Sequence, residues 1–231
     1  YFKFEDASDE VVENTKLGYV PQVFWNPVSE NLGEYVRGEK PLDGLTVYNF
    51  DTEKAKAVLD AAGWKVGEDG YRYKDGTKLE VKWMLSKDNS VLETLIPMVQ
   101  KSWKEIGVDL KQTTVDFNTL IDTVQNPEKS SEWDVFFMAI GYTGLSDGDA
   151  NSNYGNTPDN YPQIHDAQLD EYLRKGMYTK DAETSKENYL RAMERASEVD
   201  AYLPIYGNQY FDLYNKRVKN LKTSSVHSWA Q

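Results

Sequence analysis

Apolar side chains recur every three or four positions in two stretches of the first half of the chain, which is the period of an amphipathic helix. The first stretch, residues 51–62, begins at Asp51, which can cap a helix, and is followed by Gly63, a common residue just past a helix end. The second stretch, residues 90–106, contains Pro97, which should kink the helix or delay its regular start. The pattern predicts one helix in each stretch.

Two other stretches alternate between apolar and polar residues, which is the pattern of strands covered on one face. They are residues 79–85 and 108–115, and the second predicted helix lies between them. Two strands joined by a helix of this length form a βαβ unit, so we expect them to be parallel neighbours. Before them, Asp75-Gly76 predicts a tight hairpin turn. After them, residues 133–140, which are apolar apart from Asp134, predict a central strand buried on both faces.

A polar segment rich in Gly, Asp and Asn, residues 141–165, interrupts the periodic pattern. A loop of this length within a compact domain is uncommon and is usually functional. Residues 1–50 are rich in Pro, Gly and aromatic residues and show little periodicity, so we expect extended segments and loops that pack on the rest. Further helices are predicted over residues 116–125, 167–178 and 181–202, and short strands over residues 203–206 and 210–214.

The composition limits the classes of partner. The formal net charge is −12, and no run of basic residues offers the cationic face that nucleic acids or anionic membrane surfaces require. There is no cysteine, which excludes disulfides, thiol nucleophiles and cysteine-ligated zinc. The densest apolar run, residues 135–140, is far short of the roughly 18 residues of a membrane span. The chain opens at Tyr1 without an initiator Met or a signal peptide, so we expect that processing or design removed its true beginning.

The histidines do not predict catalysis. His165 stands beside Asp166, which is explained as a helix cap, and His227 lies in a polar tail. Neither is accompanied by a nucleophile elbow, and no phosphate-binding or dinucleotide motif occurs. We therefore expect no enzymatic activity and no cofactor.

Residues 147–153 carry oxygen-bearing side chains at alternate positions, as a calcium loop does. Ser152 and Pro158 occupy the positions at which an EF-hand needs Gly and Glu, so an EF-hand is not expected. A looser calcium site and a plain polar surface loop both remain open.

Six blocks of the sequence share one resemblance: Tyr48–Trp64, Asp75–Leu79, Val99–Val108, Trp133–Val135 with Gly141–Gly144, Asp181 with Lys186–Met193, and Tyr202–Tyr206. In this order they are similar to the family 5 extracellular solute-binding proteins. That family includes the oligopeptide-, dipeptide- and nickel-binding proteins of ABC importers. The resemblance covers about residues 45–221.

This resemblance implies an α/β fold of the periplasmic-binding-protein type, a lobe with a mixed sheet flanked by helices. It implies the ligand-capturing lobe of an extracellular oligopeptide-binding protein that delivers peptides to the permease of an ABC transporter. The location would be extracellular or periplasmic, with the full-length protein anchored as a lipoprotein. The expected organisation is residues 1–50 as packing segments, 51–221 as the ligand-binding lobe and 222–231 as a tail.

The sequence also departs from the family pattern. Family members are longer and carry an amino-terminal lobe, whose Trp-Ser-Asp-Gly block is absent here, so we expect a single lobe that lacks its partner lobe. In peptide-binding relatives an aspartate just after a Gly-Trp step pairs with the amino terminus of the peptide. Counting from Gly141-Tyr142 gives Leu145 or Ser146 at that place, and Asp147 comes next; Asp149 takes the role if the loop is shifted. The resemblance implies a ligand site on residues 141–157, made by Tyr142, Ser146, Asp147, Asp149 and Tyr154.

Other interpretations stay open. The aromatic, Asp and Asn residues of the same loop are also typical of a glycan-binding module, and an accessory domain of a hydrolase is a further alternative. A family 5 protein can also bind nickel or a sugar instead of a peptide. The 16 Tyr and 6 Trp residues either offer surfaces on which ligands stack or fill the edges of a core. Because glycan binders expose coplanar aromatic rings, the exposure of Tyr142 and Tyr154 should discriminate between these functions.

Overall fold

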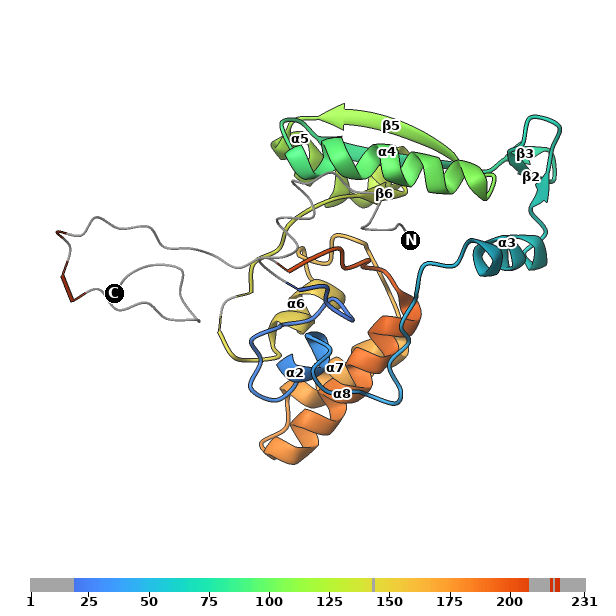
Figure 1. The fold of residues 1–231 in the computed structure, drawn as a ribbon. Helices are drawn as coiled ribbons and strands as arrows, with labels where there is room; N and C mark the ends of the chain where they lie inside the picture. The colour runs from blue at the N-terminus through green and yellow to red at the C-terminus, as the bar shows by residue number, and fades with distance from the viewer. Residues whose placement is uncertain (1–18, 143, 208–216, 218, 221–231) are drawn as a thin grey trace. The chain divides into compact units, whose positions relative to one another are not determined.

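The computed structural model describes residues 19–142, 144–207, 217, 219 and 220 (Figure 1). Backbone contacts divide the chain into two compact units. The first unit contains the described residues 48–139, and the second contains 19–47 together with the described residues from 140 onward. The predicted boundaries after residues 50 and 221 stay a prediction. No helix in the described part of the chain is both long enough and apolar enough to cross a membrane.

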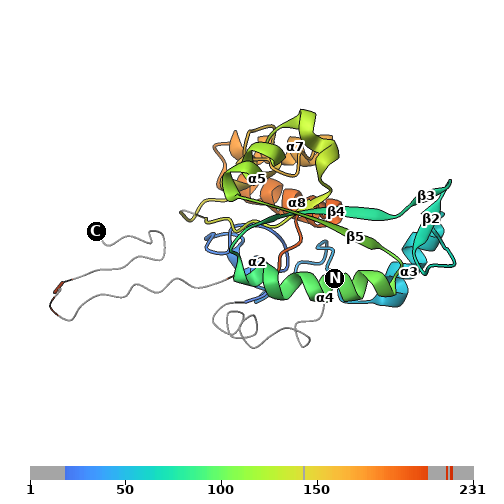
Figure 2. The same cartoon turned by 90° about the horizontal axis from the view of Figure 1, so that it is seen from above.

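The first unit is built around a parallel βαβ motif. Strand β4 (Glu80–Ser86) pairs in parallel with β5 (Asp109–Val115), from Glu80 opposite Asp109 to Ser86 opposite Val115. Helix α4 (Ser90–Glu105) connects them and runs alongside both strands (Figure 2). Of its buried residues, Leu92, Leu95, Ile96 and Val99 lie on the face that the periodicity predicted, and Met98 is buried in addition. The predicted strands, helix and parallel pairing are therefore confirmed.

Pro97 lies inside α4 without delaying the start of the helix. The side chain of Asn89 caps that start, since its carbonyl oxygen accepts from the amides of Val91 and Leu92. Pro97 itself has no N–H to donate to the carbonyl of Glu93 one turn earlier. The helix tolerates this because the flanking apolar residues are buried on one face.

A small antiparallel sheet precedes the βαβ motif. It consists of β1 (Lys65–Val66), β2 (Arg72–Lys74) and β3 (Thr77–Lys78) in that order. Asp75 and Gly76 connect β2 to β3 with φ angles of 50° and 79°, the left-handed values that a tight hairpin turn requires. This predicted turn is confirmed. The parallel and antiparallel pairings expected for a mixed sheet thus occur in two separate sheets of the described chain.

The helix before this small sheet, α3 (Thr52–Ala61), also forms where it was predicted. The Asp51 carboxylate caps it by accepting from the amide of Lys54 at 2.8 Å, and Gly63 follows its end with φ of 90°. None of its residues is buried, and Val58 is 61% exposed. The apolar face of α3 is therefore not covered by any part of the chain that the structure describes.

Arg72 is the buried charge that joins these elements. It is 2% exposed, its Nε donates to the carbonyl of Ile106 at 2.7 Å, and its Nη1 donates to the Asp60 carboxylate at 2.8 Å. Nη1 also donates to the carbonyl of Trp64 at 2.7 Å. One guanidinium thus connects the hairpin with the carboxyl-terminal ends of α3 and α4.

The prediction of a central strand over residues 133–140 was wrong. Strand β6 covers only Val135–Phe136, and it pairs in parallel with β4 at an edge of the described sheet, whose order is β5-β4-β6. Residues 135–138 are only partly buried. The continuous apolar run was interpreted as burial on both faces, but the chain leaves the sheet after two paired residues and enters the second unit at residue 140. Between β5 and β6 lie α5 (Phe117–Val124), capped by Asp116 as predicted, and the 3-10 helix η2 (Pro127–Glu132).

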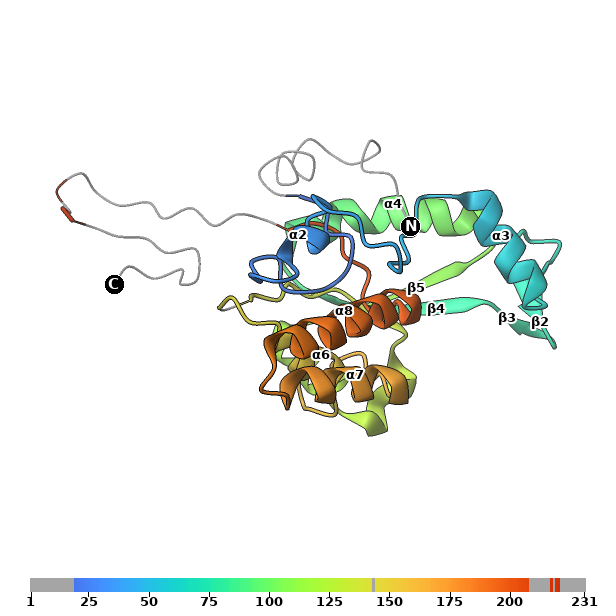
Figure 3. The ribbon, with the colours of Figure 1, turned by 90° about the horizontal axis from the view of Figure 1, so that it is seen from below.

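The second unit is mainly helical. It contains α2 (Gly33–Val36), α6 (Asp149–Tyr154), α7 (Ala167–Met177) and α8 (Ala182–Val199). The long helices α7 and α8 lie side by side (Figure 3), and Asp166 and Asp181 cap them as predicted. The core joins segments far apart in sequence: Val23, Trp25, Leu32, Val36, Ala150, Tyr154, Leu169, Leu173, Tyr189, Ala192, Met193 and Ala196.

Two predictions for the second unit need correction. Residues 141–165 are not a continuous loop, because α6 forms within them once Ala150 and Tyr154 are buried in the core. Residues 203–206 form no strand; the nearby pairing is a single antiparallel bridge between Tyr19 and Gly207. The predicted strand over residues 210–214 lies outside the described residues.

Candidate functional site

The loop that the sequence singled out, residues 141–157, is held by an early segment of the same unit. Three consecutive carbonyls of the loop accept hydrogen bonds from this segment. The side-chain amide of Asn26 donates to the carbonyls of Gly144 and Ser146, at 3.1 and 2.8 Å. The backbone amide of Glu30 donates to the carbonyl of Leu145 at 3.2 Å. The position of the loop backbone is therefore set by residues more than a hundred positions earlier in the chain.

Asp147 is buried within this connection. It is 4% exposed, and its Oδ1 accepts a hydrogen bond from the Trp25 indole nitrogen at 2.9 Å. Burial raises the pKa of the Asp147 carboxyl above its ordinary value, while hydrogen bonds from the Ser29 and Trp25 side chains lower it in part. Asp147 thus has protein partners of its own, and its contacts are those of a residue that fixes the loop.

Asp149 differs from Asp147. It opens α6, is only partly buried, and its Oδ2 is covered from solvent without a hydrogen-bond partner in the described part of the chain. Burial raises the pKa of its carboxyl, and the sources of that shift among the described residues include no cation. A covered carboxylate oxygen without a donor is costly, so it favours binding of a donor or a positive charge.

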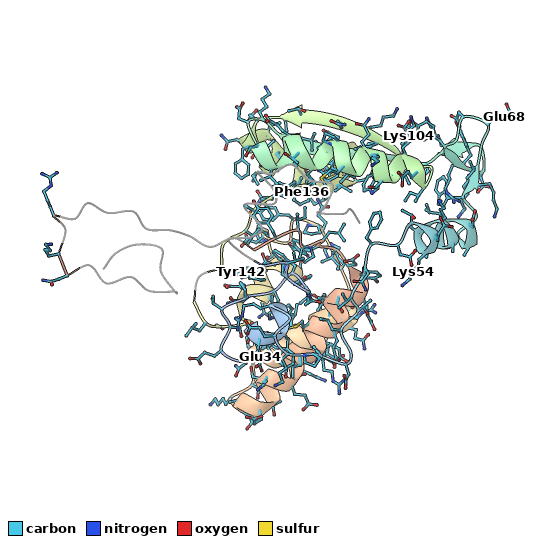
Figure 4. The ribbon with its side chains drawn as sticks, in the orientation of Figure 1. Glu34, Lys54, Glu68, Lys104, Phe136 and Tyr142 are labelled. Atoms are coloured by element: carbon cyan, nitrogen blue, oxygen red, sulfur yellow. The ribbon has the colours of Figure 1, made fainter. Side chains whose placement is uncertain are left out.

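Tyr142 provides a second unpartnered polar atom on the same loop. The residue, labelled in Figure 4, lies on the stretch before α6, and its ring centroid is 5.6 Å from that of Phe24. Its hydroxyl is buried and has no hydrogen-bond partner among the described residues. Burial raises the pKa of Tyr142, and the charges of neighbouring groups, Asp149 among them, raise it further. The hydroxyl therefore stays protonated at neutral pH and can donate a hydrogen bond.

Tyr154 and Ser146 have other roles. Tyr154 is 2% exposed, its hydroxyl donates to the carbonyl of Phe24 at 2.8 Å, and its ring packs edge-on against Tyr202 at 5.1 Å. Burial raises its pKa well above the ordinary value. Ser146 is exposed, and its Oγ accepts from the amide of Gly148 at 3.0 Å, which leaves the hydroxyl hydrogen available. The burial of Tyr154 removes it from any platform of exposed rings on which a glycan would stack.

Sequence reasoning missed the segment that holds the loop. Phe24 stacks on Tyr202 with ring centroids 4.0 Å apart, Trp25 contacts Tyr154 and Tyr189, and Asn26 is 1% exposed. The signal was the adjacent Phe-Trp-Asn-Pro of residues 24–27, in a region that shows no periodicity. Nothing in the local sequence identifies the partners of these residues.

The histidines and the calcium-like pattern gain no support. His165 is exposed beside the cap Asp166, and His227 lies outside the described residues. Within the described ranges, no group of three or more His, Asp or Glu side chains is arranged to hold a metal ion. In the 147–153 pattern, Asp147 accepts from Trp25, and Asn151 donates to the Tyr189 hydroxyl at 2.8 Å and to the carbonyl of Gly148 at 3.3 Å.

The sequence of the chain is similar to those of known proteins of one family. A family model described as "Bacterial extracellular solute-binding proteins, family 5 Middle" matches residues 12–163. The chain is 27% identical over 202 residues to the oligopeptide-binding protein AppA of Bacillus subtilis (strain 168), covering 87% of this chain and 32% of that protein. It is 26% identical over 190 residues to the oligopeptide-binding protein OppA of Lactococcus lactis subsp. lactis (strain IL1403), covering 78% of this chain and 31% of that protein. The chain thus spans about a third of the length of the curated relatives it matches.

The fold agrees with that of a solved structure. The oligopeptide-binding protein AppA from Bacillus subtilis, in complex with a nonapeptide, superposes with a TM-score of 0.69 at 21% identity, over 87% of this chain and 39% of that chain. This likeness confirms the predicted α/β, periplasmic-binding-protein-like fold. Because the family model matches well over half of the sequence, from residue 12 to residue 163, the chain belongs to the bacterial extracellular solute-binding proteins of family 5.

Proposed function

We propose that this chain is the ligand-capturing lobe of an extracellular oligopeptide-binding protein that delivers peptides to an ABC transporter. The observation that carries the proposal is the similarity to two oligopeptide-binding proteins of different bacteria, over 87% and 78% of the chain. An extracellular or periplasmic location follows from the family, which is one of binding proteins. That the chain has no enzymatic activity, and that the protein is anchored as a lipoprotein, are further parts of the proposal.

A second lobe completes the proposed site. The relatives are about three times as long as the matched segment, so the proposal includes an amino-terminal lobe and a permease as partners. Two-lobe binding proteins capture a ligand by closing about a hinge. Extended peptides offer backbone donors and acceptors, so such a site can accept many sequences.

On this chain, Asp149 is the proposed partner of a cationic ligand group, such as the ammonium of a peptide. Its Oδ2 lacks a donor among the described residues and no cation contributes to the shift of its pKa, whereas Asp147 already accepts from Trp25. A charge-assisted hydrogen bond in such surroundings contributes about 1.5–3 kcal/mol. Tyr142 and Ser146 are the proposed neutral donors, and Asp147 and Tyr154 support the loop from within the core.

The first experiment identifies the ligand. The protein that carries this chain together with the proposed second lobe is purified, and mass spectrometry is used to identify the molecules that accompany it. Peptides with free amino termini are expected. A glycan or a metal complex as the accompanying ligand contradicts peptide capture.

The 231-residue chain alone should give negligible heat in calorimetric titration with peptide pools, and sub-micromolar binding by it would contradict a two-lobe site.

A second experiment tests Asp149. In the two-lobe protein, Asp149→Asn is expected to weaken binding of free-amine peptides by about ten- to a hundred-fold, which is a loss of one to two decades in Kd. Amino-acetylated peptides should be nearly unaffected. The matched control is Asp170→Asn, which removes the same charge from an exposed site on α7. Equal losses for both kinds of peptide would show that Asp149 shapes the loop and does not hold the amine.

A further inference from the structure

We infer that Asn26 is the positioning residue of the ligand loop: its buried side chain fixes the backbone of residues 144–146 and thereby the place of Asp149. Asn26 was not identified by any sequence pattern. The inference rests on the proposed function, because it names the residue that prepares the proposed site for a ligand.

The amide nitrogen and the amide oxygen of the Asn26 side chain both have hydrogen-bond partners within the protein. The side chain is 1% exposed, and its amide nitrogen donates to the carbonyls of Gly144 and Ser146 at 3.1 and 2.8 Å. Its Oδ1 accepts from the amide of Val28 at 3.0 Å. Both N–H groups of the amide are therefore engaged, and the side chain has no donor left for a ligand. Asn26 acts through the loop and does not contact the ligand.

The geometry of the two acceptors explains why one side chain is sufficient. Gly144 and Ser146 are two residues apart, so a single amide that bonds both carbonyls fixes the peptide unit before Leu145 and the one after Ser146. Gly144 has φ of 97°, a left-handed conformation that a glycine adopts freely and other residues resist. The amide thus holds a turn that depends on a glycine, shortly before the residues that begin α6.

No other described side chain makes this connection. The Glu30 amide bonds the carbonyl of Leu145 at 3.2 Å, and the Trp25 indole bonds Asp147 at 2.9 Å. Neither reaches the carbonyls of Gly144 or Ser146. Without the Asn26 amide these two carbonyls have no donor from the segment, so the loop is expected to turn them toward water and to move Asp149 with it.

Asn26→Asp is the sharpest test because it removes both N–H donors and keeps the shape of the side chain. The carboxylate is nearly isosteric and keeps the acceptor for the Val28 amide, but it has no N–H and places a negative charge beside two carbonyl oxygens. Asn26→Ser is the second variant, which removes the amide without adding charge. It keeps the test informative if the first variant does not fold.

Asn160 offers a matched control in the same unit. It is 6% exposed, donates to the carbonyl of Ile164 at 2.8 Å and accepts from the amide of Ile164 at 3.2 Å. Asn160→Asp therefore removes a buried amide donor and adds the same charge outside residues 141–157. A loss of global stability alone should be similar in the two variants, whereas a loss of loop position should occur only at Asn26.

Binding is measured in the two-lobe protein with one free-amine peptide identified by mass spectrometry and its acetylated form. We expect Asn26→Asp and Asn26→Ser to weaken free-amine binding by about ten-fold, and Asn160→Asp to leave the Kd within about two-fold. In the Asp149→Asn background, Asn26→Asp should cost less than about three-fold, because the group that it positions is already lost. Hydrogen exchange of the amides around Gly144 and Asp149 should accelerate in the Asn26 variants only.

The outcomes separate this inference from the function on which it rests. If the unaltered two-lobe protein binds no peptide, the proposed function fails. If it binds peptide and the Asn26 and Asn160 variants have equal Kd values, the positioning role is overturned while the function stands. Additive losses of Asn26→Asp and Asp149→Asn also overturn it, since independent contributions would show that Asn26 does not act through Asp149.

Discussion

Seven consecutive residue pairs join β4 to β5 in the first unit, whereas the described part of the second unit has only the single bridge between Tyr19 and Gly207. The first unit is held by backbone hydrogen bonds between strands that one helix connects. The second unit is held by side chains: stacked aromatic rings, buried helix faces, and amides or indoles that bond residues up to 122 positions away.

This difference separates two ways of placing functional groups. A parallel ladder repeats the same bond at each residue, so the loss of one side chain changes little beyond its own packing. In the second unit, single side chains such as Trp25 and Asn26 determine where a whole loop lies. The proposed ligand loop depends on the less regular of the two arrangements, which accords with the usual location of binding residues on loops held by a rigid scaffold.

The largest expected effect comes from removing the aromatic anchor of the second unit. Trp25 is 2% exposed and contacts Tyr154 and Tyr189, so Trp25→Ala should lower the free energy of unfolding by about 3–5 kcal/mol. Hydrogen exchange followed by mass spectrometry should show loss of protection in α7 and α8. Leu95→Ala in α4, which is 2% exposed, is the matched change in the first unit and should affect β4 and β5 instead. Equal loss of protection in both units for either variant would contradict this expectation of a local effect.

The next effect tests Arg72, the buried charge among the described residues of the first unit. Arg72→Met removes three hydrogen bonds that join β2 to α3 and α4 and leaves two carbonyls without this donor, so we expect a loss of about 2–3 kcal/mol in chemical denaturation. Lys111→Met, which removes a half-exposed lysine that pairs with Asp109 and Glu80, should cost less than about 1 kcal/mol. If both variants lose the same stability, Arg72 is no more important than a surface ion pair.

A smaller effect concerns two carboxylates of the second unit, Asp147 and Asp166, whose contributions to stability should depend on pH in opposite directions. Burial raises the pKa of Asp147, so its contribution to stability is complete below the ordinary carboxyl pKa of about 3.9 and is lost as pH rises through the raised value. Asp147→Asn keeps an acceptor for Trp25 without a charge. Its stability relative to the unaltered protein should therefore improve between pH 4 and pH 7, as measured by urea unfolding across that range.

Asp166 serves as a control, because its pKa is lowered whereas that of Asp147 is raised. Arg195 lowers the pKa of Asp166 through hydrogen bonds of 2.7 and 3.2 Å, so its stabilisation is present above the ordinary pKa and is lost as pH falls through the lowered value. Asp166→Asn should cost up to about 1 kcal/mol at pH 7, and this cost should vanish in acid. The same pH trend in the Asp147 and Asp166 variants would refute the assignment of opposite shifts.

The smallest effect concerns α3, the helix that buries none of its residues. Val58→Ser should change the free energy of unfolding by less than about 0.5 kcal/mol, because Val58 is 61% exposed. Asp51→Ala, which removes the helix cap, should cost more, about 1 kcal/mol. A larger loss for Val58→Ser than for Asp51→Ala, measured by thermal unfolding, would show that the apolar stripe of α3 is covered in solution.

The elements predicted from short patterns were the ones found where they were expected. Asp51, Asp116, Asp166 and Asp181 cap the helices that follow them, Asp75-Gly76 forms the hairpin turn, and β4 and β5 pair in parallel. Each of these features depends on residues within a few positions or on one helical connection. The predictions that were wrong concerned residues 133–140, 141–165 and 203–206; in the first two, burial rather than local pattern decides the outcome.

The candidate site illustrates the same limit. The sequence identified the loop and its polar residues, but Asp147 and Asp149 are two positions apart and have the same side chain, so no local rule distinguishes them. The structure gives Asp147 an indole donor 122 residues away and leaves one oxygen of Asp149 without a partner among the described residues.

The sequence by itself determined the family, the α/β class, the caps and turns, and the segment that carries the polar site, because these depend on periodicity, composition and short motifs. Only the tertiary structure decided that residues 24–30 hold the loop, that Asn26 and Trp25 are its anchors, and that Tyr154 is buried. The physical reason is the range of the interactions. Caps and turns satisfy backbone groups within one turn of chain, whereas a buried amide or indole bonds whichever carbonyl or carboxylate the folded path brings within about 3 Å.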